Sequence, residues 1–212
     1  MMGVRNKEKF KRILLTAGMA VCMCLAGCAS MYKDFGIAHL RIGQYEQAIL
    51  NFNKALEMNP KLAEAYCNRG AIYCEVKREY DRAISDFNKA LEINTRYAEA
   101  YWGRGAAYFH KGEYDRCISD LNKAIEINPK LAEVYVARGC AYIIKEEEYH
   151  KAISDFNKAL EINPKLAVAY HNRAIAYEGI GEYDKAKEDF QKARSLAGQV
   201  HQKYLGKPVY PR

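Results

Sequence analysis

The chain has 212 residues, is 50% hydrophobic and 28% charged, and contains five prolines but no Ser/Gly-rich or Gln-rich linker. This composition excludes an intrinsically disordered chain. The net charge is +7, of which five basic residues and one glutamate in the first 27 positions supply +4. The remaining +3 is too small and too scattered to form a basic patch, so we expect no nucleic-acid partner.

The N-terminus has the layout of a secretory signal peptide. Residues 1–12 are basic, and the apolar stretch from Ile13 to Gly27 has about 15 residues. That is shorter than the ~20 residues that span a bilayer as a helix. The stretch ends in Leu25-Ala26-Gly27-Cys28, which resembles the lipobox of bacterial lipoproteins. The resemblance implies that residues 1–27 are removed and that Cys28 is lipidated as the first residue of the mature protein. An uncleaved signal anchor is the alternative.

The rest of the chain repeats itself with a period of about 34 residues. A tyrosine recurs at Tyr66, Tyr101, Tyr135 and Tyr170, and a large apolar residue at Phe52, Phe87, Leu121, Phe156 and Phe190. Each unit reads as two short amphipathic helices, here called helix A and helix B. Such a period predicts an all-α solenoid in which each repeat packs on its neighbours.

The residues within each unit follow one pattern. Helix A carries Tyr at position 4, Gly at 8 and Tyr at 11, and helix B carries Ala at 20, Phe at 24 and Ala at 27, with Pro at 32. This pattern resembles the tetratricopeptide repeat. The resemblance implies a right-handed α-solenoid of about five helix–turn–helix repeats. We assign the repeats to residues 28–60, 61–95, 96–129, 130–164 and 165–197.

Repeat one is the least regular and begins two or three residues after Cys28. We therefore expect an extended tether of about 10 Å that holds this repeat almost on the membrane. At the other end, Leu196-Ala197-Gly198 is expected to end the last helix. Residues 198–212 would then form a short cap or tail.

The turn between helices A and B alternates along the chain. Repeats one, three and five carry Gly43, Gly112 and Gly181, which suit a left-handed helix C-cap. Repeats two and four lack this glycine and have one extra residue. The alternation is typical of a duplicated two-repeat unit.

Position 7 of helix A is arginine in repeats two to five, and position 23 of helix B is then aspartate. Repeat one has Phe35 and Asn51 at these places, so both charges are lost together. We interpret the residues as partly shielded Arg–Asp pairs that join helices A and B. A basic ladder for an acidic ligand is the alternative. The pairs are Arg69–Asp86, Arg104–Asp120, Arg138–Asp155 and Arg173–Asp189.

No motif of a known catalytic or cofactor site is present, and the five histidines are dispersed. The cysteines show no CxxC motif or zinc spacing, and Cys67 and Cys74 are too far apart on one helix to form a disulfide. We therefore expect no enzyme activity, no cofactor, no metal and no small-molecule substrate.

The resemblance to tetratricopeptide repeats implies a concave groove lined by positions 2, 5, 6, 9, 12 and 13 of helix A. Apolar residues there are not needed for packing, so they favour a contact surface for an extended peptide or a partner protein. Burial of some of them against the next helix A is the alternative. The candidates are Cys67, Asn68, Cys74, Trp102, Phe109, His110, Val136, Cys140, Ile143, His171 and Asn172.

Together these features predict a lipid-anchored envelope lipoprotein that acts as a scaffold or adaptor for a partner protein. Similar lipoproteins serve in envelope, secretion or pilus assembly, or as adaptors for proteases and hydrolases. Because Ala29 rather than Asp follows Cys28, the resemblance implies the outer membrane, facing the periplasm. Two alternatives stay open. The solenoid could have a structural role through self-association, or the protein could be a cytosolic co-chaperone whose N-terminus is not a signal.

Overall fold

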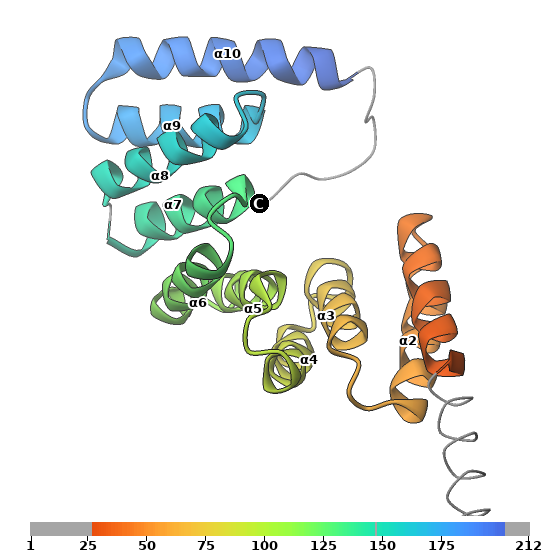
Figure 1. Cartoon of the computed structure of the whole chain (residues 1–212). Coiled ribbons are helices and arrows are strands. Elements are labelled where there is room, and N and C mark those ends of the chain that lie inside the picture. Colours follow the sequence, from red (N-terminus) through yellow and green to blue (C-terminus); the bar gives the residue numbers. More distant parts are fainter. Residues whose placement is uncertain (1–26, 147, 202–212) are drawn as a thin grey trace, which may run out of the picture. The chain divides into compact units, whose positions relative to one another are not determined.

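The computed structural model describes residues 27–146 and 148–201, and within these ranges all regular structure is helical (Figure 1). The predicted all-α class is therefore confirmed. The signal peptide expected before Cys28 lies outside the described residues, apart from Gly27, and so does the chain from residue 202. The chain divides into two compact units, Met1–Thr95 and Arg96–Arg212.

The first unit contains two helix pairs. Residues 27–41 are helical and are followed by α2 (Tyr45–Met58). The second pair consists of α3 (Ala63–Ile72), continued by the π-helical turn η1 (Tyr73–Lys77), and α4 (Tyr80–Ile93). Helix α3 packs against both α2 and α4, so the two pairs share one core.

The second unit contains three helix pairs (Figure 1). These are α5 (Ala98–His110) with α6 (Tyr114–Ile127), α7 (Ala132–Glu146) with α8 (Tyr149–Ile162), and α9 (Ala167–Gly179) with α10 (Tyr183–His201). Each pair packs on the next through α6 against α7 and α8 against α9. This packing places the three helices A of the second unit next to one another, because α7 contacts both α5 and α9.

Each of repeats one to four is built around one buried side chain of helix B. Phe52, Phe87, Leu121 and Phe156 are fully buried. The glycine at position 8 of helix A makes room for this side chain. A Cβ on Gly139 would lie 2.6 Å from Phe156 Cε1, whereas a Cβ on Gly105 would lie 3.3 Å from Leu121 Cδ2. Position 8 therefore accepts a methyl group only where the facing side chain can move.

We expect Gly139→Ala to destabilise the protein by about 1–3 kcal/mol, because the Phe156 ring is enclosed and cannot retreat without strain. Gly105→Ala should cost less, because its Cβ would be 3.3 Å from Leu121, a tight contact that a shift of a few tenths of an ångström relieves. Urea unfolding of the two variants beside the parent protein measures the difference. Equal losses would mean that the helical glycine itself, rather than the ring, sets the cost.

The turns between helices A and B confirm the predicted alternation. Gly43, Gly112 and Gly181 have φ of 75°, 76° and 79°. In these repeats the N–H after the glycine donates to the carbonyl five residues earlier, as Glu113 N does to Tyr108 O at 2.9 Å. In repeat two the same bond spans six residues, from Glu79 N to Tyr73 O at 2.8 Å. The extra residue is absorbed by η1 and by Arg78, whose φ is 55°.

Two expectations at the ends of the chain are wrong. No extended tether separates Cys28 from repeat one, because residues 27–41 are helical and Ala29 is already buried. The last helix does not end at Leu196-Ala197-Gly198 but continues as α10 to His201. A glycine inside a helix costs only about 1 kcal/mol relative to alanine, so Gly198 alone does not end it. The cap expected beyond it lies outside the described residues.

Candidate functional site

A hollow of about 240 Å³ opens in the second unit between helices α5, α7 and α9. Its wall is mostly apolar and includes side chains from α6 at its base. We call this hollow the α5–α7–α9 pocket. It is lined by Trp102, Ala106, Phe109, His110, Cys117, Leu121, Glu133, Val136, Ala137, Cys140, Leu166, Val168 and Asn172.

Helical spacing explains how one face of each helix supplies the wall. On α7 the lining residues Glu133, Val136, Ala137 and Cys140 stand at i, i+3, i+4 and i+7, so they lie on one stripe. On α5 the stripe holds two rings, Trp102 and Phe109, with an alanine between them. The small side chains in the middle of both stripes leave the space that the rings border.

The rings and thiols of the pocket are held in place by their surroundings. Phe109 makes an edge-to-face contact with Tyr114, the first residue of α6, with ring centroids 5.6 Å apart. Burial raises the pKa of Cys140 to about 12, and burial, followed by the nearby Asp120, raises the pKa of Cys117 to about 12. Both thiols are therefore neutral near pH 7 and behave as small apolar groups rather than as nucleophiles.

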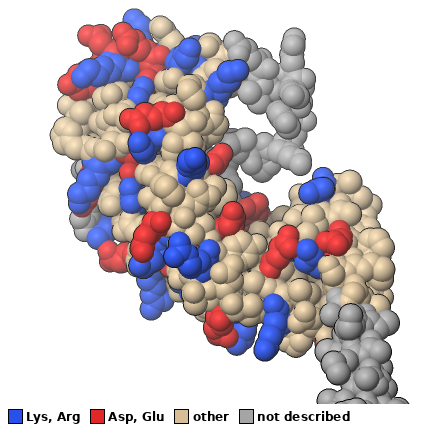
Figure 2. Space-filling view, in the orientation of Figure 1, with Lys and Arg blue, Asp and Glu red and all other residues tan. Residues whose placement is uncertain are grey.

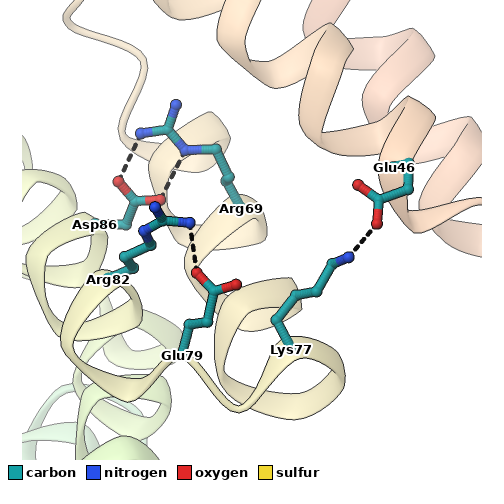
Figure 3. A network of polar contacts seen from close by, with 6 residues as sticks. All are labelled: Glu46, Arg69, Lys77, Glu79, Arg82 and Asp86. Atoms are coloured by element: carbon teal, nitrogen blue, oxygen red, sulfur yellow. Dashed lines mark hydrogen bonds and ion pairs between the residues drawn. The ribbon is translucent and has the colours of Figure 1, made fainter.

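All four predicted Arg–Asp pairs form, and each is bidentate. Arg69 donates from Nε and Nη2 to Asp86 at 2.7 and 2.6 Å, as Figure 3 shows, and Arg138 reaches Asp155 at 2.8 and 2.6 Å. The aspartates are only 5–6% exposed. Hydrogen bonding to the aspartate raises the pKa of Arg138, against the opposing effect of burial. The arginine charges are paired with aspartates inside the fold, so they are not available to bind an acidic ligand.

The arginines also join neighbouring repeats, which the sequence analysis missed. Nη1 of Arg138 donates to Oδ1 of Asn122 in the preceding repeat at 2.6 Å, and Arg173 does the same to Asn157 at 2.5 Å. Each guanidinium also lies over the position-4 tyrosine of its own repeat, as Arg138 lies 5.7 Å from the Tyr135 ring centroid. We call this repeated set of contacts the arginine ladder.

A second link between repeats starts from the longer turns. Lys77, in η1, forms an ion pair with Glu46 in the first turn of α2 (Figure 3). Lys145, one repeat position earlier in repeat four, pairs with Asp115 in the first turn of α6 at 2.6 Å. The alternation of turns thus gives each even repeat a contact with helix B of the odd repeat before it.

Comparison with known proteins decides the family. Models described as TPR repeat match residues 36–76 and 77–112, and models described as tetratricopeptide repeat match residues 98–131, 132–166 and 156–188. The chain belongs to the tetratricopeptide repeat family. The matched segments follow one another through all five helix pairs, from repeat one to repeat five.

Solved tetratricopeptide repeat proteins resemble most of the chain. A crystal structure of MamA protein is 29% identical, with a TM-score of 0.67, over 87% of this chain and 98% of that one. The crystal structure of YrrB, described as a TPR protein with an unusual peptide-binding site, is 25% identical, with a TM-score of 0.62, over 79% of this chain and 85% of that one. MamA from Desulfovibrio magneticus RS-1, at 22% identity and a TM-score of 0.70, shares the fold.

One curated relative shares a shorter segment. The Protein SGT1 homolog of Oryza sativa subsp. japonica is 40% identical over 43 residues, which is 20% of this chain and 12% of that protein. The chain therefore spans only a small part of that relative's length. The matched segment is only slightly longer than one repeat of this chain, so the match adds no function.

The α5–α7–α9 pocket brings together part of the predicted groove of these repeats. The predicted groove residues that line it are Trp102, Phe109, His110, Val136, Cys140 and Asn172. Sequence reasoning passed over Glu133, Ala137 and Val168, although they occupy groove positions 2 and 6 of the repeat. Leu166 lies before its helix, and Cys117 and Leu121 belong to helix B, so the pattern of helix A gives no signal for them.

The other predicted groove residues do not line the pocket. Cys67 and Cys74 belong to the first unit and are core residues, 8% and 3% exposed, and burial raises the pKa of Cys74 to about 12. Ile143 packs against the core around Phe156. His171 is exposed but stands edge-on to Phe190, with ring centroids 5.4 Å apart, and does not line the pocket. Asn68 is half-buried on α3, in the first unit.

The described residues hold no group of three or more His, Cys, Asp or Glu side chains placed to bind a metal ion. Between residues 27 and 201, as far as the structure describes them, no helix is long and apolar enough to cross a membrane. The cysteines in this part of the chain, Cys28 included, are thiols rather than disulfides, and Cys28 is partly exposed.

Proposed function

We propose that this protein is a lipid-anchored scaffold of the bacterial cell envelope that binds an extended segment of a partner protein in the α5–α7–α9 pocket. The observation that carries the proposal is the pocket itself, in which three successive helices A turn apolar side chains toward one open hollow. Binding sites are concave and mostly apolar, with a few polar groups that fix orientation. His110, Glu133 and Asn172 supply such groups here.

The charge around the pocket indicates the chemistry of the partner. At the groove positions of α5, α7 and α9 the charged residues are Glu99, Glu133 and Glu178, all of them exposed, and no lysine or arginine occurs there. Glu133 is the charged residue among those that line the pocket. A segment with apolar side chains and a neighbouring lysine or arginine would match both the wall and the carboxylates.

The similarity to YrrB, described as having a peptide-binding site, supports binding of a peptide segment rather than a small molecule. The envelope location is supported by the sequence Leu25-Ala26-Gly27-Cys28 and by the partial exposure of the Cys28 thiol. In a bacterium with two membranes we place the protein at the outer membrane, facing the periplasm. Assembly of envelope, secretion or pilus machinery and the recruitment of a protease or hydrolase are the roles that such a scaffold fits.

The test is site-specific photo-crosslinking in the native host. A photoreactive amino acid at Trp102, and separately at Phe109, should give one recurrent adduct with another protein. The same amino acid at Tyr183, which is 69% exposed and lies away from the pocket, should not give that adduct. Adducts only between copies of this chain would establish the self-associating alternative. No adduct from either pocket position would exclude the pocket as the binding site.

Cellular fractionation tests the anchor separately. The parent protein should partition with membranes. Cys28→Ser removes the thiol that would carry the lipid, so this variant should leave the membrane fraction. Unprocessed protein that stays in the soluble fraction irrespective of this substitution would favour the co-chaperone alternative.

A further inference from the structure

The first helix carries an apolar stripe on the side that faces away from its own core. Met31, Phe35 and Ile42, at its end, are 46%, 50% and 67% exposed, and Ala38 between them is exposed as well. Steps of four, three and four residues place them on one line along the helix. Ala29 and Gly36, on the other side, are buried. We call the four exposed residues the N-terminal stripe.

In the later repeats the same face of helix A is covered by the preceding repeat. Positions 3 and 10 are Ala65 and Ile72 in repeat two, which pack with Phe52 of repeat one. In repeat four these positions are Val134 and Ala141, which pack with Leu121 of repeat three. Met31 and Ala38 are the equivalent residues of repeat one, the first repeat that the structure describes. The N-terminal stripe is therefore an uncovered repeat-packing face.

The last helix that the structure describes shows how a face exposed to water looks. The last helix, α10, presents polar residues on its exposed side, and in Figure 2 charged side chains crowd the region of α10 whereas the region of the first repeat is mostly tan. The exposed polar residues of α10 include Lys187, Glu188, Gln191, Lys192, Arg194 and Ser195. Terminal repeats need such a polar outer face to stay soluble. The N-terminal stripe lacks one.

The loss of charge in repeat one sharpens this contrast. Phe35 stands where the later repeats carry the arginine of the ladder, and Asn51 stands in place of the aspartate. Leu50, also exposed, replaces the serine that repeats two to four have at the same position. Each change replaces a polar or charged group by a less polar one at the same end of the protein. Such a surface is suited to an apolar surrounding.

The position of Cys28 indicates that this apolar surrounding is the membrane. It precedes Met31 by three residues and Phe35 by seven, so it continues the N-terminal stripe at the start of the same helix. Because no extended tether follows Cys28, acyl chains on its sulfur would leave the protein along the line of the stripe. A stripe and a lipid together provide the two signals that stable membrane attachment requires.

We propose that the N-terminal stripe lies in the surface of the bilayer, with the first helix parallel to the membrane. This inference rests on the lipid anchor of the proposed function. Met31, Phe35 and Ile42 enter the boundary between headgroups and acyl chains, while Asp34 and Arg41, on the flank of the helix, stay in the headgroup layer. The lipid and the N-terminal stripe together then fix the orientation of repeat one on the membrane, instead of holding it through a flexible linker.

The test uses the full-length lipidated protein, purified from its host and reconstituted into phosphatidylethanolamine–phosphatidylglycerol vesicles. An environment-sensitive thiol dye is attached at Phe35→Cys, and in a matched variant at Asp34→Cys, one residue away on the flank. The native thiols interfere little, because Cys28 is blocked by lipid and Cys67, Cys74 and Cys117 are buried, as is most of Cys140. Mass spectrometry of each sample reports whether Cys28 carries the lipid.

Brominated acyl chains should quench the dye at position 35 several-fold more than the dye at position 34, and its emission should shift to the blue. A dye at Ile42→Cys should behave like the one at position 35. Equal, weak quenching at all three positions in lipidated protein would overturn the inference and leave the anchor intact. A concentration-dependent crosslink between the position-35 thiols of two copies would also overturn it, in favour of a second copy as the cover. Unlipidated Cys28, or retained residues 1–27, would instead refute the anchor on which the inference rests.

Discussion

Asp155→Ala should destabilise the protein by about 3–5 kcal/mol, because it leaves the Arg138 guanidinium largely buried without its carboxylate. Arg138 is held by two hydrogen bonds to Asp155, one to Asn122 and the face of Tyr135. Removal of the aspartate breaks the strongest of these contacts and leaves the arginine charge unpaired between two repeats. Urea unfolding monitored by circular dichroism measures the loss.

The first repeat supplies the matched control. It tolerates Phe35 and Asn51 at the places of the pair, so the double variant Arg138→Phe/Asp155→Asn removes both charges and restores an arrangement that this chain already contains. We expect the double variant to lose less stability than Asp155→Ala alone, since no uncompensated charge remains. If the double variant lost as much stability as Asp155→Ala alone, the pair would be contributing net stability and not only avoiding the penalty of an unpaired buried charge.

The Arg–Asp pairs could be predicted from the sequence because repeat one loses both partners at once. The asparagines of the ladder left a comparable signal that the sequence analysis did not use. Asn53, Asn122 and Asn157 precede a repeat that contains the arginine, whereas the last repeat, which no arginine follows, has Gln191 at this position. The signal concerns residues in different repeats, so comparison within one repeat does not reveal it.

The pocket could be predicted only in part. Position in the repeat determines which face of helix A a side chain occupies, but not how deeply that side chain is buried or whether it borders a hollow. Cys67 and Val136 occupy the same groove position and are equally buried, but only Val136 borders the hollow. The repeat pattern does not specify where a hollow opens between neighbouring helices. The π-helical turn after Ile72 is a similar case, since the extra residue was visible in the sequence while its accommodation depended on local backbone geometry.

Ala106→Leu should abolish partner binding without harm to the fold. Ala106 lies between Trp102 and Phe109 on the wall of the α5–α7–α9 pocket, and a larger side chain there would fill part of the 240 Å³ hollow. Filling an existing hollow commonly adds about 0.5–2 kcal/mol to stability, so the melting temperature should stay equal or rise. A ligand that needs the same space would lose its anchor, and we expect its dissociation constant to rise at least about 100-fold, which corresponds to roughly 2.7 kcal/mol.

The measurement is fluorescence anisotropy with a peptide that spans the segment crosslinked to Trp102 or Phe109. Ala197→Leu, an equal change on the exposed face of α10, should leave affinity unchanged. Glu133→Lys should weaken binding about tenfold if a basic residue of the segment meets this carboxylate. Unchanged affinity in Ala106→Leu, with the expected gain in stability, would show that the hollow is a packing defect and that the partner binds elsewhere. Because stability and affinity are predicted to move in opposite directions, a general loss of folding cannot produce the expected result.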